Sequence, residues 1–359
     1  MVVLAAAPLV RGQVGGRTVY DFLYLAPGAR TTALGGTLVS QQQADPSLAF
    51  QNPATLSDST HSVGQVSYIN YIKDVGYGTF AYSHTEPKLA HFWGGIQYFS
   101  YGQFEETDIL GNRLGSFSIS TLNVAAGAAR SFGPLTLGMN LKYVQSVIYR
   151  QTSWGLATDF GAHWKPKDWG LEAGIVVRNL GLVIDQLPGQ APSEGMPFTI
   201  DVGISQKLPK APLRFTVTAV QLNRPRMIYQ DPTAPLRFDL AGNPIDERPT
   251  TGQQLMRHLI AGIEIVPTRS FNVRFSYNHR RRQELHPPDM GFNFDGLSLG
   301  VGLRLGNIWL DYAYAGYHVA GGLHHFQLTL PLARVVKKSV LPRRNIERQP
   351  AEPRPAETP

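Results

Sequence analysis

From about residue 61 to residue 332 the chain is a series of stretches in which large apolar side chains alternate with small or polar ones. The clearest stretch is 152–165. One parity there holds Trp154, Leu156, Thr158, Phe160, Ala162 and Trp164, and the other holds Ser153, Gly155, Ala157, Asp159, Gly161 and His163. A period of two is typical of β-strands, because successive side chains point to opposite faces. The pattern predicts an all-β chain.

Turn residues divide this region into about fourteen strands, an even number as expected of a bacterial single-chain barrel. The predicted strands are 61–72, 76–84, 91–101, 116–131, 134–149, 152–165, 169–180, 198–207, 213–223, 257–266, 271–280, 295–304, 308–317 and 321–332. Every second connection is short, whereas four of the others are long: 102–115, 181–197, 224–256 and 281–294. Short periplasmic turns alternating with long external loops are typical of outer-membrane barrels. The even count then predicts that both termini are periplasmic.

The tryptophans give the height of the expected apolar belt. Trp154 and Trp164 are ten residues apart, which is about 34 Å along a strand. Tilted by about 40°, this distance projects to about 26 Å, close to the belt of an outer-membrane barrel, which is bounded by aromatic girdles. We therefore assign Trp154, Trp164 and Trp169 to the lipid girdle.

A soluble β-sandwich is the alternative reading of the alternation. Strands of about ten residues are long for a globular protein, and the second parity is rich in Gly, Ser and Thr rather than in surface charge. Charged residues make up only 16% of the chain, below the roughly 25% of soluble domains. No apolar run reaches the roughly 18 residues of a membrane helix. These features favour a closed membrane barrel over the sandwich.

The rest of the chain divides into three parts. Residues 1–12 are expected to be the remnant of a signal peptide, with cleavage before Gln13. Residues 13–60 lack alternation and are expected to form a small N-terminal plug, or hatch, with a short helix near 45–51 that ends before Pro53. Residues 333–359 are rich in Pro, Arg and Glu and are expected to be a disordered periplasmic tail.

We find no pattern that predicts catalysis, a metal site or a cofactor. The chain has no cysteine and lacks the nucleophile, zinc and phosphate-loop motifs. His324 and His325 are adjacent on a strand and should point to opposite faces. The net charge of +7 is not accompanied by a basic helix or a basic-aromatic platform, which argues against nucleic-acid binding.

Charged residues of the inward parity are candidate lumen residues. They could line a channel, but their mixed signs favour salt bridges among themselves and with hatch residues such as Arg30. The candidates are Lys142, Asp159, Glu172, Arg178, Arg274 and Arg304.

Basic and aromatic residues in the long loops are candidate partner contacts, either for an acidic protein surface or for lipopolysaccharide phosphates. A solvated cluster of rim charges is the plainer alternative. The candidates are Arg280, Arg281 and Arg282 in one loop and Arg224, Arg226, Tyr229, Arg237 and Phe238 in the other.

Short motifs distributed over residues 17–332 resemble the PorQ family of the type IX secretion system, within the wider PorV/FadL-like barrels. The motifs are Tyr20-Asp21-Phe22-Leu23-Tyr24-Leu25, Ala29-Arg30, Ala33-Leu34-Gly35-Gly36, Gln51-Asn52-Pro53-Ala54, Gly95-Ile96-Gln97-Tyr98, Phe104-Glu105-Glu106-Thr107-Asp108, Arg178-Asn179-Leu180-Gly181, Arg281-Arg282-Gln283-Glu284-Leu285, Tyr317-His318 and Ala320-Gly321. Each is weak alone; their order and spacing carry the resemblance.

The resemblance implies a fourteen-stranded barrel with a hatch in the outer membrane of a Gram-negative bacterium. It also implies a non-enzymatic role in the attachment complex, where such barrels hold the surface proteins PorZ and PorU together with PorV. Cargo is joined to lipopolysaccharide there. The tail after residue 332 departs from the family pattern. A FadL-like transporter of hydrophobic substrates is the second hypothesis, which the polar inward parity disfavours.

Overall fold

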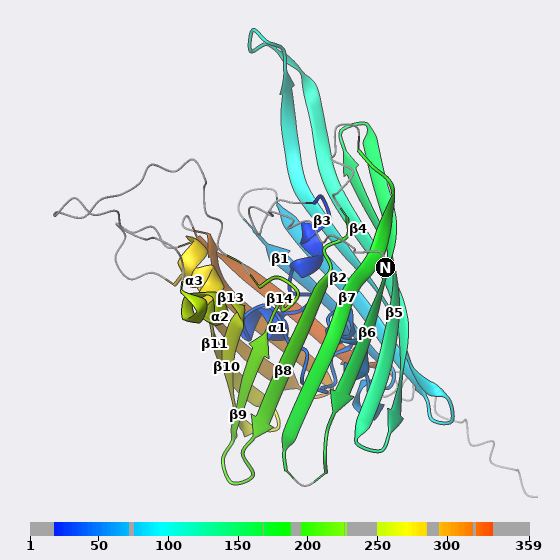
Figure 1. Ribbon diagram of the computed structural model, residues 1–359, viewed down its shortest axis with the longest axis vertical. Coiled ribbons are helices and arrows are strands. Elements are labelled where there is room, and N and C mark those ends of the chain that lie inside the picture. Colours follow the sequence, from blue (N-terminus) through cyan, green and yellow to red (C-terminus); the bar gives the residue numbers. More distant parts are fainter. Residues whose placement is uncertain are drawn as a thin grey trace, which may run out of the picture.

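The chain forms one closed β-barrel around a small N-terminal segment, as the computed structural model in Figure 1 shows. The structure describes residues 18–71, 75–167, 169–187, 195–225, 227, 250–285, 294–318 and 321–332. These residues make fourteen antiparallel strands, each paired with its neighbours in sequence, and β1 pairs with β14 to close the sheet. The predicted all-β barrel is confirmed.

The strands follow the predicted order. They are β1 (Val63–Asn70), β2 (Gly76–Glu86), β3 (Ala90–Thr107), β4 (Arg113–Phe132), β5 (Leu135–Ile148), β6 (Gln151–Trp164), β7 (Leu171–Asp185), β8 (Thr199–Lys207), β9 (Leu213–Ala219), β10 (Leu259–Thr268), β11 (Phe271–Asn278), β12 (Leu297–Leu305), β13 (Ile308–His318) and β14 (Gly321–Pro331). The helices are η1 (Asp21–Tyr24), α1 (Ala29–Ala33), η2 (Pro46–Phe50), η3 (Pro53–Thr55), η4 (Asp58–Thr60), α2 (Thr251–His258) and α3 (His279–Leu285).

The barrel wall is much taller on one side than on the other. Strands β3 to β7 have 14 to 20 residues, whereas the remaining strands have 7 to 11. The rim at the end with the long connections is therefore slanted, and the β3–β4 hairpin rises above its neighbours (Figure 1). Val63 of β1 pairs with Pro331 of β14, so the two ends of the barrel chain lie together at the end with the short turns.

The prediction of a long loop at 102–115 is wrong. Strand β3 continues to Thr107 and β4 starts at Arg113, which leaves a connection of five residues. Small and polar residues on both parities hid these strand ends, since above the barrel rim neither face needs to be apolar. Gly102, with φ of 86°, lies in a bulge where β3 leaves the rim, and such a bulge bends a strand and increases its twist.

The N-terminal segment 18–62 lies inside the barrel. Its short helices include η2 at Pro46–Phe50, where a helix near 45–51 was predicted. Asp45 caps η2 by accepting from the Ser47 amide at 3.0 Å, and Asn52 caps η3 by accepting from the Ala54 amide at 3.0 Å. Proline follows each cap, so both turns begin with a fixed φ and no lost donor. We call this segment the plug.

Glycines of the inward parity let the plug lie directly against the wall. A Cβ added to Gly174 of β7 would collide with the carbonyl group of Val39, and one added to Gly161 of β6 would collide with the Asn52 side chain. Aromatic packing adds to this fit, since Phe50 of the plug meets Trp93 of β3 edge-to-face at 4.7 Å. The small inward residues seen in the sequence are thus the ones that make room for the plug.

Candidate functional site

A buried network of charges joins the plug to the wall. Glu264 of β10 accepts from Arg30 of the plug at 2.7 Å, from Arg214 of β9 at 2.9 Å and from Arg274 of β11 at 3.0 Å. Arg274 is fully buried and also reaches Asp311 of β13 at 2.7 Å. Burial, together with the nearby Arg274, lowers the pKa of Arg30. Buried ion pairs of this kind hold the plug in one position against the wall, because the loss of one partner leaves a buried charge unpaired.

Four of the other predicted lumen residues have charged partners, whereas Arg304 donates to the Gly306 carbonyl in the short β12–β13 turn at 3.1 Å. Asp159 pairs with Lys142 at 2.7 Å, and its second oxygen accepts from the Asn179 amide at 2.8 Å. Glu172 pairs with Lys165 at 3.2 Å and accepts from the Gln42 amide of the plug at 2.8 Å.

Arg178 of β7 donates through Nε to Asp201 of β8 at 3.0 Å. The structure therefore groups Arg30 with Arg274, and leaves Asp159, Glu172 and Arg178 in three separate contacts.

Neutral hydrogen bonds complete the attachment of the plug. Gln327 of β14 accepts from the Ala29 amide at 2.7 Å, and Asn140 of β5 donates to the Ala49 carbonyl at 2.7 Å. Ser40 and Ser205 of β8 share a hydrogen bond of 2.7 Å, in which both hydroxyl groups are buried. The plug is thus bonded to strands on several sides of the barrel.

A cavity of about 230 Å³ remains between the plug and the end with the long connections. Its wall includes Arg178, Arg280 and Arg281 beside Leu25 and Ile260. The Tyr24 side chain also lines it, and burial raises the pKa of Tyr24 to about 12. The cavity is small and its lining is mixed, because the three guanidinium groups and the Glu284 carboxylate share the wall with apolar side chains.

Only part of the predicted arginine cluster faces outwards. These residues lie on α3, and successive residues of a helix point in directions about 100° apart. Arg281 is buried, donates to the Gly35 carbonyl of the plug at 3.1 Å and stacks on Tyr317 at 3.6 Å. Its assignment as a partner contact is corrected, because it holds the plug. Arg280 and Arg282 remain partly exposed.

The second predicted contact loop is described only in part. Arg224 is partly exposed and lies over the Tyr24 ring at 6.0 Å. Residues Arg226, Tyr229, Arg237 and Phe238 lie outside the described residues. Their predicted role as partner contacts stays a prediction.

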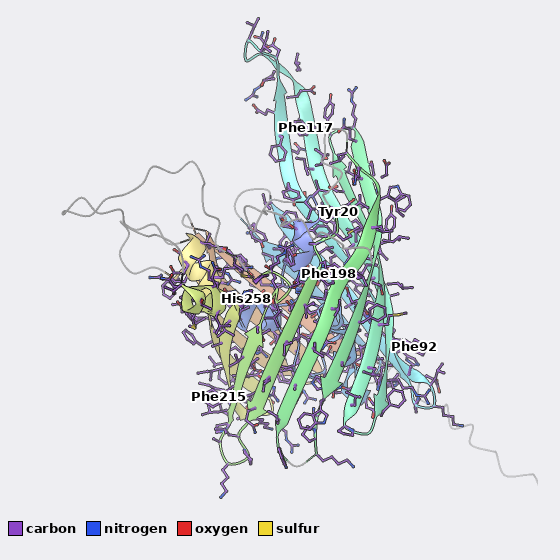
Figure 2. All side chains as sticks on the ribbon, in the orientation of Figure 1. Tyr20, Phe92, Phe117, Phe198, Phe215 and His258 are labelled. Carbon is purple, nitrogen blue, oxygen red and sulfur yellow. The ribbon has the colours of Figure 1, made fainter. Side chains whose placement is uncertain are left out.

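The outer face of the wall is apolar over its whole circumference. Phe92 of β3 and Phe215 of β9 both stand on it (Figure 2), with 39% and 41% of their surfaces exposed. Trp164 lies at the short-turn end of β6 and Trp169 in the connection that follows, whereas Trp154 lies at the other end of β6, with its ring 6.0 Å from that of Tyr143.

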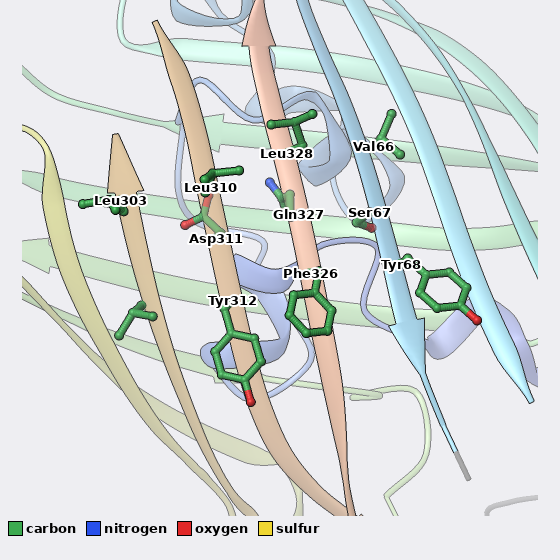
Figure 3. A pocket seen from close by; sticks show the side chains of 11 residues that line it. Val66, Ser67, Tyr68, Leu303, Leu310, Asp311, Tyr312, Phe326, Gln327 and Leu328 are labelled. Atoms are coloured by element: carbon green, nitrogen blue, oxygen red, sulfur yellow. The ribbon is translucent and has the colours of Figure 1, made fainter. Parts of the chain in front are cut away.

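A groove of about 460 Å³ crosses the outer face over β1, β14, β13 and β12. Val66, Tyr68, Leu310, Tyr312, Phe326 and Leu328 line it, as seen in Figure 3. The intervening residues, including Asp311 and Gln327, belong to the opposite parity and meet the plug or the lumen network. The groove therefore belongs to the apolar outer surface rather than to the lumen.

The part of the chain that the structure describes shows no group of three or more potential metal ligands and no helix long and apolar enough to cross a bilayer. His325 points inwards and contacts Thr32 of the plug at 2.8 Å, whereas His324 points outwards and contacts Tyr312 at 2.8 Å. Adjacent strand residues diverge here as the sequence predicted.

Sequence reasoning missed three acidic partners of the buried arginines. Glu264, Asp201 and Asp311 were not singled out, although each is an acid of the inward parity on a strand whose other parity is apolar. An isolated carboxylate on an otherwise apolar strand was the available signal, because such a group must be paired when buried.

A closed barrel whose outward parity is apolar and whose lumen is filled is a transmembrane β-barrel. Its fold is that of the FadL-like outer-membrane barrels. It is similar to the toluene transporter TbuX of Ralstonia pickettii, with a TM-score of 0.51 and 13% identity over 87% of this chain and 98% of that one.

Two further structures match with lower TM-scores. The toluene transporter TodX of Pseudomonas putida has a TM-score of 0.49 and 12% identity over 87% of this chain and 98% of that one. A FadL homologue of Pseudomonas aeruginosa has a TM-score of 0.46 and 14% identity over 86% of this chain and 99% of that one. No protein-family model and no curated protein matches the sequence.

Proposed function

We propose that this chain is a non-enzymatic scaffold of the outer membrane of a Gram-negative bacterium. In this proposal the short-turn end and both termini face the periplasm, and the long connections hold a partner at the cell surface. The sequence resemblance to the PorQ family supports a partner among the type IX secretion proteins, PorZ first, with PorU and PorV. Cargo attachment to lipopolysaccharide would be catalysed by a partner.

The observation that carries the proposal is the attachment of the plug to the wall. Opening a path through the lumen would break the ion pair between Glu264 and Arg30. It would also break the hydrogen bonds of Glu172 and Asn140 with the plug backbone. Separating buried charged partners is costly, at roughly 3–5 kcal/mol for one broken pair. A static plug suits a scaffold, because a scaffold needs rigid loops and no passage.

Co-purification tests the proposal. The chain would be tagged in the short connection between β8 and β9, far from the long connections, and recovered from solubilised outer membranes of its own organism. We expect PorZ-like or other type IX secretion proteins to be recovered with it. Recovery of the barrel without any type IX component would contradict the proposal.

Transport of a hydrophobic substrate is the second candidate. The fold shared with TbuX, which is described as a toluene transporter, favours it. The small volume of the cavity and the three arginine side chains in its wall disfavour it. Liposomes that contain the purified barrel separate the candidates when their uptake of radiolabelled toluene and of a long-chain fatty acid is measured. If the chain is a scaffold, the uptake rate should equal that of liposomes without protein. If it is a transporter, uptake should be faster and saturable.

A further inference from the structure

The tip of the β3–β4 hairpin presents apolar side chains to solvent on a well-defined turn. Ile109 and Leu110 lie in the connection between the strands, where Ile109 is fully exposed and Leu110 is 82% exposed, and Leu114 at the start of β4 is 64% exposed. They belong to the tip of the β3–β4 hairpin, which rises above the rim of the barrel wall (Figure 1). Contact with lipid explains the exposed apolar side chains of the barrel wall, but these three residues lie above the apolar belt.

The length of the hairpin places the tip well away from the membrane. Strand β2 pairs with β3 only up to Ser100, and β5 pairs with β4 only from Ile119. The seven steps from Ser100 to Thr107 then extend the two-stranded ribbon by about 23 Å. Ile109 and Leu110 therefore cannot lie among the acyl chains that surround the wall.

The turn is held by hydrogen bonds of Asp108. One carboxylate oxygen accepts from the amides of Leu110 at 2.9 Å and Asn112 at 2.8 Å, and the other accepts from the Asn112 side chain at 2.9 Å. Gly111, with φ of 86°, closes the turn. Because the turn is ordered before binding, docking would lose little backbone entropy.

The ribbon below the tip is also supported. Phe104 and Phe117 stack with ring centres 5.5 Å apart, and Tyr149 of the β5–β6 connection meets Phe117 edge-to-face at 5.4 Å (Phe117 is labelled in Figure 2). Tyr149 donates to Glu106 at 3.0 Å. These contacts fix the direction in which the ribbon leaves the rim.

The charges beside the tip decide between two classes of partner. Residues 101–118 carry three carboxylates, on Glu105, Glu106 and Asp108, and one guanidinium, on Arg113. An acidic ribbon repels the phosphates of lipopolysaccharide. It favours a protein surface on which basic side chains surround an apolar pocket.

We propose that the tip formed by Ile109, Leu110 and Leu114 docks into an apolar pocket, rimmed by Lys or Arg, on a surface protein. This inference rests on the proposed scaffold function and names the element of the barrel that carries it. The tip is far from Arg280 and Arg282 in the sequence and was not among the predicted contacts.

Photo-crosslinking in intact cells tests the tip. A benzophenone amino acid would replace Leu110 in one variant and Lys210, in the short β8–β9 connection, in a control. We expect one major protein adduct from position 110, absent from position 210, with the label in a partner peptide that contains apolar residues and Lys or Arg. Adducts with lipopolysaccharide alone, or the same adducts from both positions, would overturn the proposal.

Substitutions at the tip give a second test of the proposal. Ile109→Lys combined with Leu110→Lys should reduce co-purification of the partner at least about tenfold, because two apolar side chains no longer bury. The matched control, Ile109→Leu with Leu110→Ile, should retain it. Glu105→Lys with Glu106→Lys should also weaken it. Unchanged recovery in the lysine variants overturns the tip proposal while the scaffold stands; if even the unmodified chain recovers no type IX component, the scaffold itself fails.

Discussion

The Nη1 atom of Arg30, in the plug, lies 2.7 Å from Oε1 of Glu264, in the barrel wall, across 234 positions of sequence. Arg214 and Arg274 converge on the same carboxylate. One carboxylate thus pairs with guanidinium groups from the plug and from two strands. Because all four side chains are largely buried, the contact ties folding of the wall to placement of the plug.

Replacing Glu264 by Gln should destabilise the folded barrel by about 3–5 kcal/mol, since it leaves buried guanidinium groups without their shared carboxylate. The urea midpoint of the barrel in detergent micelles, followed by its heat-modifiable gel mobility, measures this. The control is Glu105→Gln, which removes the exposed pair with Arg113 and should cost at most about 1 kcal/mol. Equal effects of the two substitutions would contradict the role assigned to Glu264.

A charge in the middle of the outer face should be far more costly than one at its edge. Phe160 lies near the centre of β6 and is 47% exposed, whereas Trp164 ends that strand. Phe160→Arg should destabilise the barrel in bilayers by about 2–4 kcal/mol and Trp164→Arg by about 0–1 kcal/mol. Similar values for both positions would mean that this face does not contact lipid.

A side chain at Gly174 should displace the plug. Gly174→Val places methyl groups where the Val39 backbone lies. We expect the barrel to assemble poorly or to expose the plug to added protease, which cleavage between residues 18 and 62 would report. Gly78→Ala is the control, because a Cβ there is 3.8 Å from its nearest neighbour, the Ser67 carbonyl oxygen. A protease-resistant plug in a well-assembled Gly174→Val variant would argue against the close packing.

The turn at the hairpin tip should resist mild acid. Hydrogen bonds from Asn112 hold the pKa of Asp108 below its ordinary value. A depressed folded-state pKa means that the carboxylate supports the turn fully above its unfolded pKa and ceases to do so as the pH falls through the folded one.

Hydrogen exchange at the Leu110 and Asn112 amides, corrected for intrinsic rates, should therefore show equal protection at pH 7 and pH 5. Asp108→Ala should lose that protection at both values. Protection that already falls between pH 7 and pH 5 would contradict the assignment.

Period-two alternation was sufficient to predict the barrel, because a closed wall between lipid and a packed lumen constrains both parities of every strand. It located β6 to within one residue, at 152–165 against the observed Gln151–Trp164. It failed for the ends of β3 and β4, which rise above the rim and lose that two-sided constraint.

The site was less predictable than the fold. Opposite charges of the inward parity indicated ion pairs, and Arg30 was named as a plug residue able to join them. The partner Glu264 could not be chosen, because pairing across the lumen depends on register and on the path of the plug. Arg281 was expected outside, since a run of three arginines does not show which one a helix turns inwards.

Locking the plug tests the central claim most directly. The chain has no cysteine, so Ser40→Cys with Ser205→Cys introduces a single possible disulfide between the plug and β8, where the two hydroxyl groups are now 2.7 Å apart. The account predicts that the oxidised variant keeps its co-purifying surface protein and supports cargo attachment as well as the reduced one. Loss of function on oxidation, restored by a reducing agent, would show that the plug must move and would contradict a static scaffold.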